Sequence, residues 1–234
     1  MRIAVIVPAF NEEKSIVDVV AGIHEVAAEN DLNIDIIVVN DCSADATAEL
    51  ISQLNCISLH LPVNLGIGGA MQTGFQFAFE NGYDLAIQID GDGQHPANEI
   101  PKLLSAHEKN SADVVIGSRF LEKKGFQSTT LRRTGINYFR FLNKLFAGVN
   151  ITDSTSGFRL LNKRALEVVS EYYPDEYPEA EAIVLYSKKK LKITETSVEM
   201  KKRQGGTSSI DFFSSIYYMW KVSLGIIFPL IRTK

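Results

Sequence analysis

Hydrophobic and polar positions along the first 119 residues form two alternating kinds of segment. Short, mostly apolar runs lie at residues 2–7, 34–39, 57–61, 85–89 and 112–116. Longer segments between them carry apolar residues three or four positions apart. The short runs predict strands that are buried on both faces, and the spaced positions predict amphipathic helices. This alternation predicts an α/β fold with a doubly wound, mostly parallel sheet and right-handed connections.

The predicted helices follow polar or glycine-containing turns. The first is expected after Asn11, the second runs through Leu50, and the third follows a glycine-rich turn at residues 64–70. Asn98 is expected to cap a fourth helix that ends near Lys109.

The alternation stops after Arg119. A polar loop follows at residues 120–131, and helical spacing returns at residues 132–148. Residues 153–159 lead into a strand or a turn, a short helix begins near Lys163, and another helix runs into the lysines at 188–190. Residues 191–200 form the last predicted strand.

Composition narrows the class of protein. The 234 residues, of which 45% are hydrophobic, suffice for one α/β domain with a sizeable core and an appendage. A net charge of -4 gives no basic field of the kind that nucleic-acid binding needs, so we expect no nucleic-acid partner. The apolar start is too short for a signal peptide, which predicts a cytoplasmic protein. Cys42 and Cys56 lack metal-ligand spacing and are expected to be reduced.

Candidate metal-binding side chains follow the apolar run at residues 85–89. Asp90 and Asp92 follow it, two positions apart, so the period-2 geometry of a strand predicts that they point to the same side. Two carboxylates so placed suit a hard cation that takes its other ligands from water and a substrate diphosphate, and Gln94 or His95 could add a ligand. The alternative is an Asp-Gly turn that only closes the strand.

The glycines at 66, 68 and 69 do not predict a dinucleotide cofactor. The fingerprint for such a cofactor belongs in the first strand-to-helix turn, and residues 8–12 of this chain contain no glycine. The glycine cluster is instead interpreted either as a tight turn that lines the ligand crevice or as relief of crowding at a helix start.

Several segments together resemble the family 2 glycosyltransferases of the GT-A fold, and within that family the dolichyl-phosphate mannose synthase group and its bacterial polyprenyl-phosphate relatives. They lie at residues 8–12, 40–41, 64–70, 90–96, 117–119 and 156–159. The resemblance covers residues 1–209. It implies a Rossmann-like nucleotide-sugar-binding half at 1–119 and an acceptor half at 120–209, followed by an amphipathic helix at 210–234.

The resemblance also implies a nucleotide-binding surface for a UDP- or GDP-linked sugar. Pro8, Phe10 and Glu12 would cradle the base and ribose, and Asp41 would accept hydrogen bonds from the base. Gly69 would line the same nucleotide-sugar site.

By the same resemblance, the diphosphate would be held by a metal ion and by arginines. Asp90 corresponds to a contact of both nucleotide and metal, and Asp92 and Gln94 correspond to ligands of Mg²⁺ or Mn²⁺, with Asp92 also counted as catalytic. Arg119 and Arg203 correspond to phosphate-contacting arginines, a role that suits the guanidinium fork.

The implied reaction is transfer with inversion at the anomeric carbon. The acceptor is expected to be a polyprenyl phosphate, with a hydroxyl of a cell-wall or capsular glycan as the alternative. Many relatives with hydroxyl acceptors carry a Glu-Asp pair, whereas this chain has Glu179-Ala180-Glu181 in the matching region. Glu179 is the first candidate for a catalytic base and Asp153 the second. A non-catalytic nucleotide-sugar-binding or scaffold protein is the alternative of another class.

Residues 210–231 are apolar and aromatic, with Ser214, Lys221 and Gly225 on one narrow helical stripe. They predict a helix on the membrane surface, a helix that packs a homo-oligomer, or a membrane span. Lys221 in the middle and Pro229 near the end disfavour the span. A surface helix would make the protein peripheral at the inner face of the cell membrane.

Overall fold

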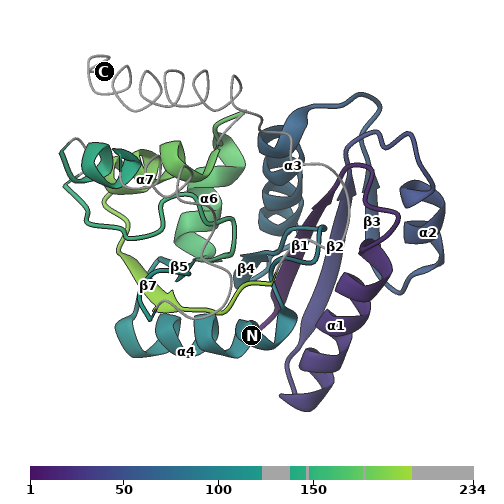
Figure 1. Cartoon of the computed structure of the whole chain (residues 1–234), viewed down its shortest axis with the longest axis horizontal. Coiled ribbons are helices and arrows are strands. Elements are labelled where there is room, and N and C mark those ends of the chain that lie inside the picture. Colours follow the sequence, from purple (N-terminus) through teal and green to yellow (C-terminus); the bar gives the residue numbers. More distant parts are fainter. Residues whose placement is uncertain (123–137, 146–147, 176–177, 202–234) are drawn as a thin grey trace.

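The structure is a computed structural model that describes residues 1–122, 138–145, 148–175 and 178–201. The described residues form one seven-stranded sheet with the order β3-β2-β1-β4-β6-β5-β7 (Figure 1). The strands are β1 (Ile3–Ala9), β2 (Ile34–Asn40), β3 (Ile57–His60), β4 (Leu85–Gln88), β5 (Val114–Ser118), β6 (Arg159–Asn162) and β7 (Ile193–Ser197).

The sheet is parallel except at one strand. β6 runs antiparallel to both of its neighbours, β4 and β5, and the other neighbouring pairs are parallel. The prediction of a mostly parallel sheet is therefore confirmed. β6 follows Arg119 in the sequence, yet it lies between two strands that precede this residue, so both parts of the chain share one sheet.

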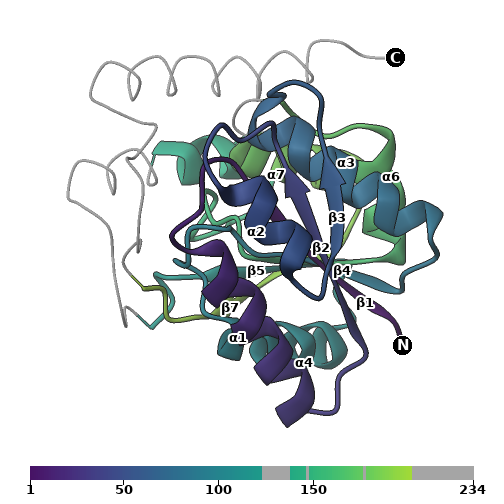
Figure 2. The same ribbon diagram turned by 90° about the vertical axis from the view of Figure 1, so that its right-hand side faces the viewer.

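Helices cover both faces of the sheet. α1 and α4 lie on one face, and α3, α6 and α7 lie on the other (Figures 1 and 2). The helices are α1 (Ile16–Glu29), α2 (Thr47–Gln53), α3 (Gly66–Glu80), the short 3₁₀ helix η1 (Ala97–Glu99), α4 (Ile100–Asn110), α6 (Lys163–Glu171) and α7 (Pro178–Lys188). A further helical segment occupies residues 138–145.

The two hydrophobic cores follow from strand geometry. Every residue of the central strand β1 is buried. Successive side chains of a strand point to opposite faces, so Val5 packs into the core under α1 and α4, whereas Ile6 packs into the core under α3 and α6. Burial on both faces explains why β1 is a continuous apolar run.

Three details differ from the predictions. Asn98 caps no helix, because it lies inside η1, and α4 begins after Glu99. β4 ends at Gln88, so the alternation of a strand does not extend to Asp90 and Asp92, which lie in and beside a turn. The last strand is shorter than residues 191–200, because β7 spans only Ile193–Ser197.

The predicted helix at 210–234 and Arg203 lie outside the described residues. Within the part of the chain that the structure describes, no helix is long and apolar enough to cross a membrane.

The helix caps yield a first prediction. The Asn162 side chain accepts a hydrogen bond from the Ala165 N–H at the start of α6 (3.0 Å) and donates to Asp113 (2.9 Å). We expect Asn162→Ala to lower the free energy of unfolding by about 0.5–2 kcal/mol. The matched control Asn98→Ala removes an exposed side chain that caps nothing, and it should stay within about 0.5 kcal/mol of wild type. Urea unfolding of both variants measures the difference, and equal losses would contradict the assignment of the cap.

Candidate active site

The carboxyl ends of β1, β2 and β4 lie next to one another, because these strands are parallel neighbours. Ligands of such sheets bind at this edge. The order of the strands therefore brings together three predicted site segments that are far apart in the sequence, at residues 8–12, at Asp41 and at residues 90–94.

The turn after β1 presents both buried and exposed groups. Pro8 is buried within the strand, whereas the Phe10 side chain is 48% exposed just beyond it. Glu12 is buried, with its N–H donating to Thr47 Oγ1 (2.8 Å) and its carboxylate accepting from Ser15 Oγ (3.0 Å). An exposed ring beside this anchored turn can stack on a planar ligand such as a nucleotide base.

Asp41 follows β2 and is buried. Its N–H donates to the Ala9 carbonyl (2.9 Å), which continues the pairing of β1 with β2. Its Oδ1 accepts from the Leu65 N–H (2.7 Å), which holds the turn before α3. Gly69 lies in the first turn of α3, where a Cβ would approach Leu65 Cβ to 2.5 Å. Asp41 and Gly69 are therefore part of one close-packed turn at the crevice.

The turn after β4 carries the two predicted metal-binding carboxylates. The Asp90 side chain is 32% exposed, whereas Asp92 is buried and its Oδ1 accepts from the Gln94 N–H (2.9 Å). Gly91 between them lies against β1, where a Cβ would come within 2.8 Å of the Pro8 carbonyl oxygen. The absence of a side chain at Gly91 thus allows the acidic turn to lie on the end of β1.

His95 is placed to support this turn. Its Nδ1 accepts from the Asp90 N–H (3.2 Å), and its ring stacks on Phe158 with the centroids 5.3 Å apart. His95 is buried. The hydrogen bond to Asp90 occupies the lone pair of Nδ1, so this nitrogen is not placed to add a metal ligand.

A second loop, at residues 153–157, runs against Asp90. A Cβ at Gly157 would lie 3.0 and 3.2 Å from the two carboxylate oxygens of Asp90. The loop is held by Arg159, a fully buried residue of β6, whose Nε donates to the Ser156 carbonyl (2.8 Å). Neither Gly157 nor Arg159 has a predicted role of its own, although both belong to the segment 156–159 that resembles the family.

Arg119 and Asp153 form an ion pair at the same edge. Arg119 Nε donates to Asp153 Oδ2 and its NH2 group donates to Oδ1, both at 2.7 Å. The Arg119 N–H also donates to Oδ2 (3.1 Å). Asp153 is fully buried and the Arg119 side chain is 14% exposed. The structure thus joins a predicted phosphate-contacting residue to a predicted base.

Glu179 lies in the first turn of α7 and is half-buried. The Arg159 NH2 group donates to the Glu179 carbonyl oxygen (2.7 Å). Burial of the carboxyl group raises the pKa of Glu179 to about 7; the positive charge of Arg159 opposes this rise and the Asp90 carboxylate adds to it. Glu179 is therefore electrostatically coupled to the acidic turn after β4.

The donor atoms after β4 suit a hard divalent cation, since carboxylate and amide oxygens are the ligands that Mg²⁺ and Mn²⁺ prefer. Within the described residues, no group of three or more His, Cys, Asp or Glu side chains could hold a metal ion. Asp90, Asp92 and Gln94 could supply only part of the ligands of such an ion, and water and a substrate diphosphate would have to supply the rest.

Two curated proteins are similar to this chain over most of their length. It is 33% identical over 217 residues to UDP-N-acetylglucosamine–dolichyl-phosphate N-acetylglucosaminyltransferase of Methanococcus voltae, covering 84% of each chain. It is 30% identical over 175 residues to undecaprenyl-phosphate mannosyltransferase of Micrococcus luteus, covering 72% of this chain and 70% of the relative.

Among solved structures, glucosyl-3-phosphoglycerate synthase from Mycobacterium tuberculosis has the same fold. Its TM-score is 0.70 at 18% sequence identity, covering 96% of this chain and 79% of that protein. That structure contains Mn²⁺, UDP and phosphoglyceric acid. The family model described as "Glycosyl transferase family 2" matches residues 4–170. The chain therefore belongs to glycosyltransferase family 2, is a glycosyltransferase, and has the GT-A fold.

Proposed function

We propose that this protein transfers a sugar, with inversion, from a UDP- or GDP-linked donor to a polyprenyl phosphate. The observation that carries the choice of acceptor is the similarity to two proteins whose names both specify a polyprenyl-phosphate acceptor, over 84% and 72% of this chain. The first also names a UDP-linked donor. A catalytic protein is favoured over a scaffold because Asp90, Asp92, Gln94 and Arg119 are all present.

In the proposed complex the nucleotide lies along the carboxyl ends of β1 and β2. The base stacks at Phe10 and bonds to Asp41, with Pro8 and Glu12 shaping the turn and Gly69 lining the sugar side. The diphosphate then reaches the acidic turn after β4, because β4 is the neighbour of β1 on the other side. Arg203 is proposed as a second phosphate contact from the segment after residue 201.

Bond breaking places negative charge on the leaving nucleoside diphosphate. A bound Mg²⁺ or Mn²⁺ supplies neutralisation of that charge, with Asp90, Asp92 and Gln94 as its protein ligands; the Mn²⁺ and UDP in the Mycobacterium tuberculosis structure support this choice. Arg119 contributes a fixed positive charge, since its ion pair with Asp153 holds the guanidinium in one orientation.

Bond making needs little help from a base if the acceptor is a lipid phosphate. A phosphate oxygen already carries negative charge at neutral pH and attacks the anomeric carbon from the face opposite the leaving diphosphate. The new oxygen–carbon bond forms as the bond from the anomeric carbon to the diphosphate oxygen breaks, so no proton has to be removed.

A hydroxyl of a glycan is the second candidate acceptor, and Glu179 is the observation that favours it. A carboxyl group with a pKa of about 7 suits a general base at neutral pH. Asp153 suits this role less well, since both of its oxygens accept hydrogen bonds from Arg119.

An exposed apolar face of the helical segment 138–145 supports the proposal that the protein contacts the membrane in which such a lipid lies. In the helical segment 138–145, Phe141 and Leu145 are each 60% exposed and Tyr138 is 36% exposed, on one helical face. Exposed Lys144 lies beside them, and Phe139 on the opposite face is buried. This face, together with the predicted helix at 210–234, is proposed to rest on anionic lipid at the inner face of the cell membrane.

The metal site yields the second prediction. Asp92→Asn keeps an acceptor for the Gln94 N–H and removes the negative charge, so the fold should persist while binding of the metal–diphosphate unit weakens at least tenfold. Calorimetric titration with UDP and with GDP, each with and without Mn²⁺, measures the change. The control is Asp18→Asn, an exposed residue of α1. Equal Mn²⁺-dependent affinity in wild type and Asp92→Asn would refute the metal assignment.

The acceptor is tested by the third prediction. With radiolabelled UDP- and GDP-sugars and undecaprenyl phosphate, we expect label in an organic-extractable, mild-acid-labile lipid, and less than a tenfold loss of turnover in Glu179→Gln. If a glycan hydroxyl is the true acceptor, label goes to the glycan. Glu179→Gln then costs on the order of 10²- to 10⁴-fold, and the wild-type rate rises with pH through about 7, because the base must be deprotonated.

The fourth prediction concerns the membrane surface. Phe141→Ser combined with Leu145→Ser should reduce flotation with anionic liposomes, since two exposed apolar side chains are removed. Deletion of residues 210–234 should reduce flotation further or change the oligomeric state. Val17→Ser, at an exposed position of α1, is the control. Undiminished flotation of both altered proteins would exclude these surfaces as the membrane contact.

A further inference from the structure

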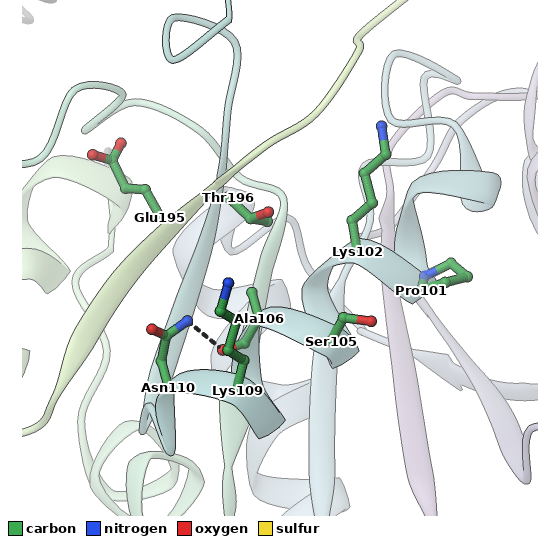
Figure 3. A pocket seen from close by; sticks show the side chains of 8 residues that line it. All are labelled: Pro101, Lys102, Ser105, Ala106, Lys109, Asn110, Glu195 and Thr196. Atoms are coloured by element: carbon green, nitrogen blue, oxygen red, sulfur yellow. Dashed lines mark hydrogen bonds between the residues drawn. The ribbon is translucent and has the colours of Figure 1, made fainter.

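Glu195 lies in the middle of β7, the strand at the edge of the sheet. It lines a groove of about 470 Å³ between α4 and β7, together with Lys102 and Lys109. Figure 3 shows that its carboxylate nevertheless turns away from these lysines and from the other labelled side chains. The groove therefore does not explain why an acidic residue stands at this position.

The partners of the Glu195 carboxylate lie in the loop after residue 151. Its Oε2 accepts from the Thr152 N–H (2.8 Å), and its Oε1 accepts from Thr152 Oγ1 (2.8 Å) and from the Asp153 N–H (3.0 Å). Two of the three donors are backbone groups, so the carboxylate sets the course of the chain directly at Asp153.

Asp153 in turn holds Arg119, as described above, through three hydrogen bonds. Thr152 makes a further contact with the segment of Arg119. Its Oγ1 lies 2.8 Å from the Oγ of Ser118, the residue that precedes Arg119 in the sequence. A continuous chain of hydrogen bonds thus runs from the edge strand to the guanidinium group, through Glu195, Asp153 and Arg119.

We propose that Glu195 is a positioning residue, which fixes the Thr152–Asp153 backbone so that Asp153 holds the Arg119 guanidinium in the orientation that meets the leaving diphosphate. The catalytic part of this inference rests on the proposed function, in which Arg119 contacts phosphate. Glu195 itself touches no reacting atom in this account.

A carboxylate is needed at this position because all three partners can donate. Glutamine has one acceptor oxygen and one NH₂ group. Whichever way its amide is turned, NH₂ faces a backbone N–H of Thr152 or Asp153, and that N–H loses its acceptor. Glu195→Gln therefore disturbs the loop with little change in volume, and the half-buried site on an edge strand favours retention of the fold.

The test begins without any substrate. In ¹⁵N-labelled protein, the Nε–H signal of Arg119, identified by its loss in Arg119→Lys, should exchange with solvent slowly, because Asp153 accepts from it. We expect exchange at least tenfold faster in Glu195→Gln and unchanged exchange in Glu108→Gln, which makes the same charge change at an exposed position of α4. Unchanged exchange in Glu195→Gln would overturn the proposal, whatever the enzyme transfers.

Turnover with undecaprenyl phosphate provides the second readout. Glu195→Gln should lower kcat about 10- to 100-fold while the thermal midpoint stays near that of wild type, since misplacing a group by about 1 Å can cost that much. The same substitution should cost much less in an Asp153→Asn background, because Glu195 acts through Asp153. If Glu195→Gln lowers kcat by the same factor with and without Asp153→Asn, Glu195 does not act through Asp153, and the proposal is overturned.

Two outcomes separate this inference from the proposed function. If the wild type transfers no sugar to undecaprenyl phosphate, the choice of acceptor fails, and the exchange of the Arg119 signal still decides the role of Glu195. If Glu195→Gln does not fold, Thr152→Val removes only one of the three donors and should shift the exchange and kcat in the same direction to a smaller extent. Unchanged values in that variant would count against the proposal.

Discussion

The antiparallel insertion of β6 between β4 and β5 is the constraint on which the rest of this site depends. β6 pairs Arg159 with Gln88, the last residue of β4, so the loop that precedes β6 must end beside the acidic turn that follows β4. The Asp90 carboxylate consequently lies so close to Gly157 that a Cβ at this position would come within 3.0 Å of it. A parallel strand in this place would have brought its opposite end to the carboxylates.

Arg159 holds the loop before β6 and the start of α7 in place. It is completely buried, and it donates to the carbonyl groups of Ser154, Ser156 and Glu179. A buried guanidinium is costly unless its donors find partners, so the loop and the start of α7 are held where they can supply carbonyl oxygens. The loop at residues 153–157 and the start of α7 are thereby fixed to the same strand.

Several carboxylates lie at the carboxyl-end edge of the sheet. They differ in whether a positively charged partner neutralises them. Asp153 is paired with Arg119, whereas the pKa of Glu179 is raised to about 7, chiefly by burial and to a lesser extent by the Asp90 carboxylate. A site with excess carboxylate suits the binding of a divalent ion together with a diphosphate, because the ion neutralises both. The ion pair meanwhile keeps one arginine fixed rather than free to collapse onto the acidic turn.

The sequence by itself determined the elements and the family. Apolar runs such as residues 3–9 are buried on both faces of a parallel sheet and can be recognised from period and length. Because the predicted strands are parallel, Asp41 and Asp90 are expected at the same edge, where the strands have their carboxyl ends. Only the tertiary structure decided the antiparallel direction of β6, the end of β4 before Asp90, the absence of a cap at Asn98, and the links of Asp153 to Arg119 and Glu195. The direction of β6 and the links of Asp153 depend on contacts between residues tens of positions apart. Local hydrophobic spacing carries no information about which distant polar group will satisfy a given donor.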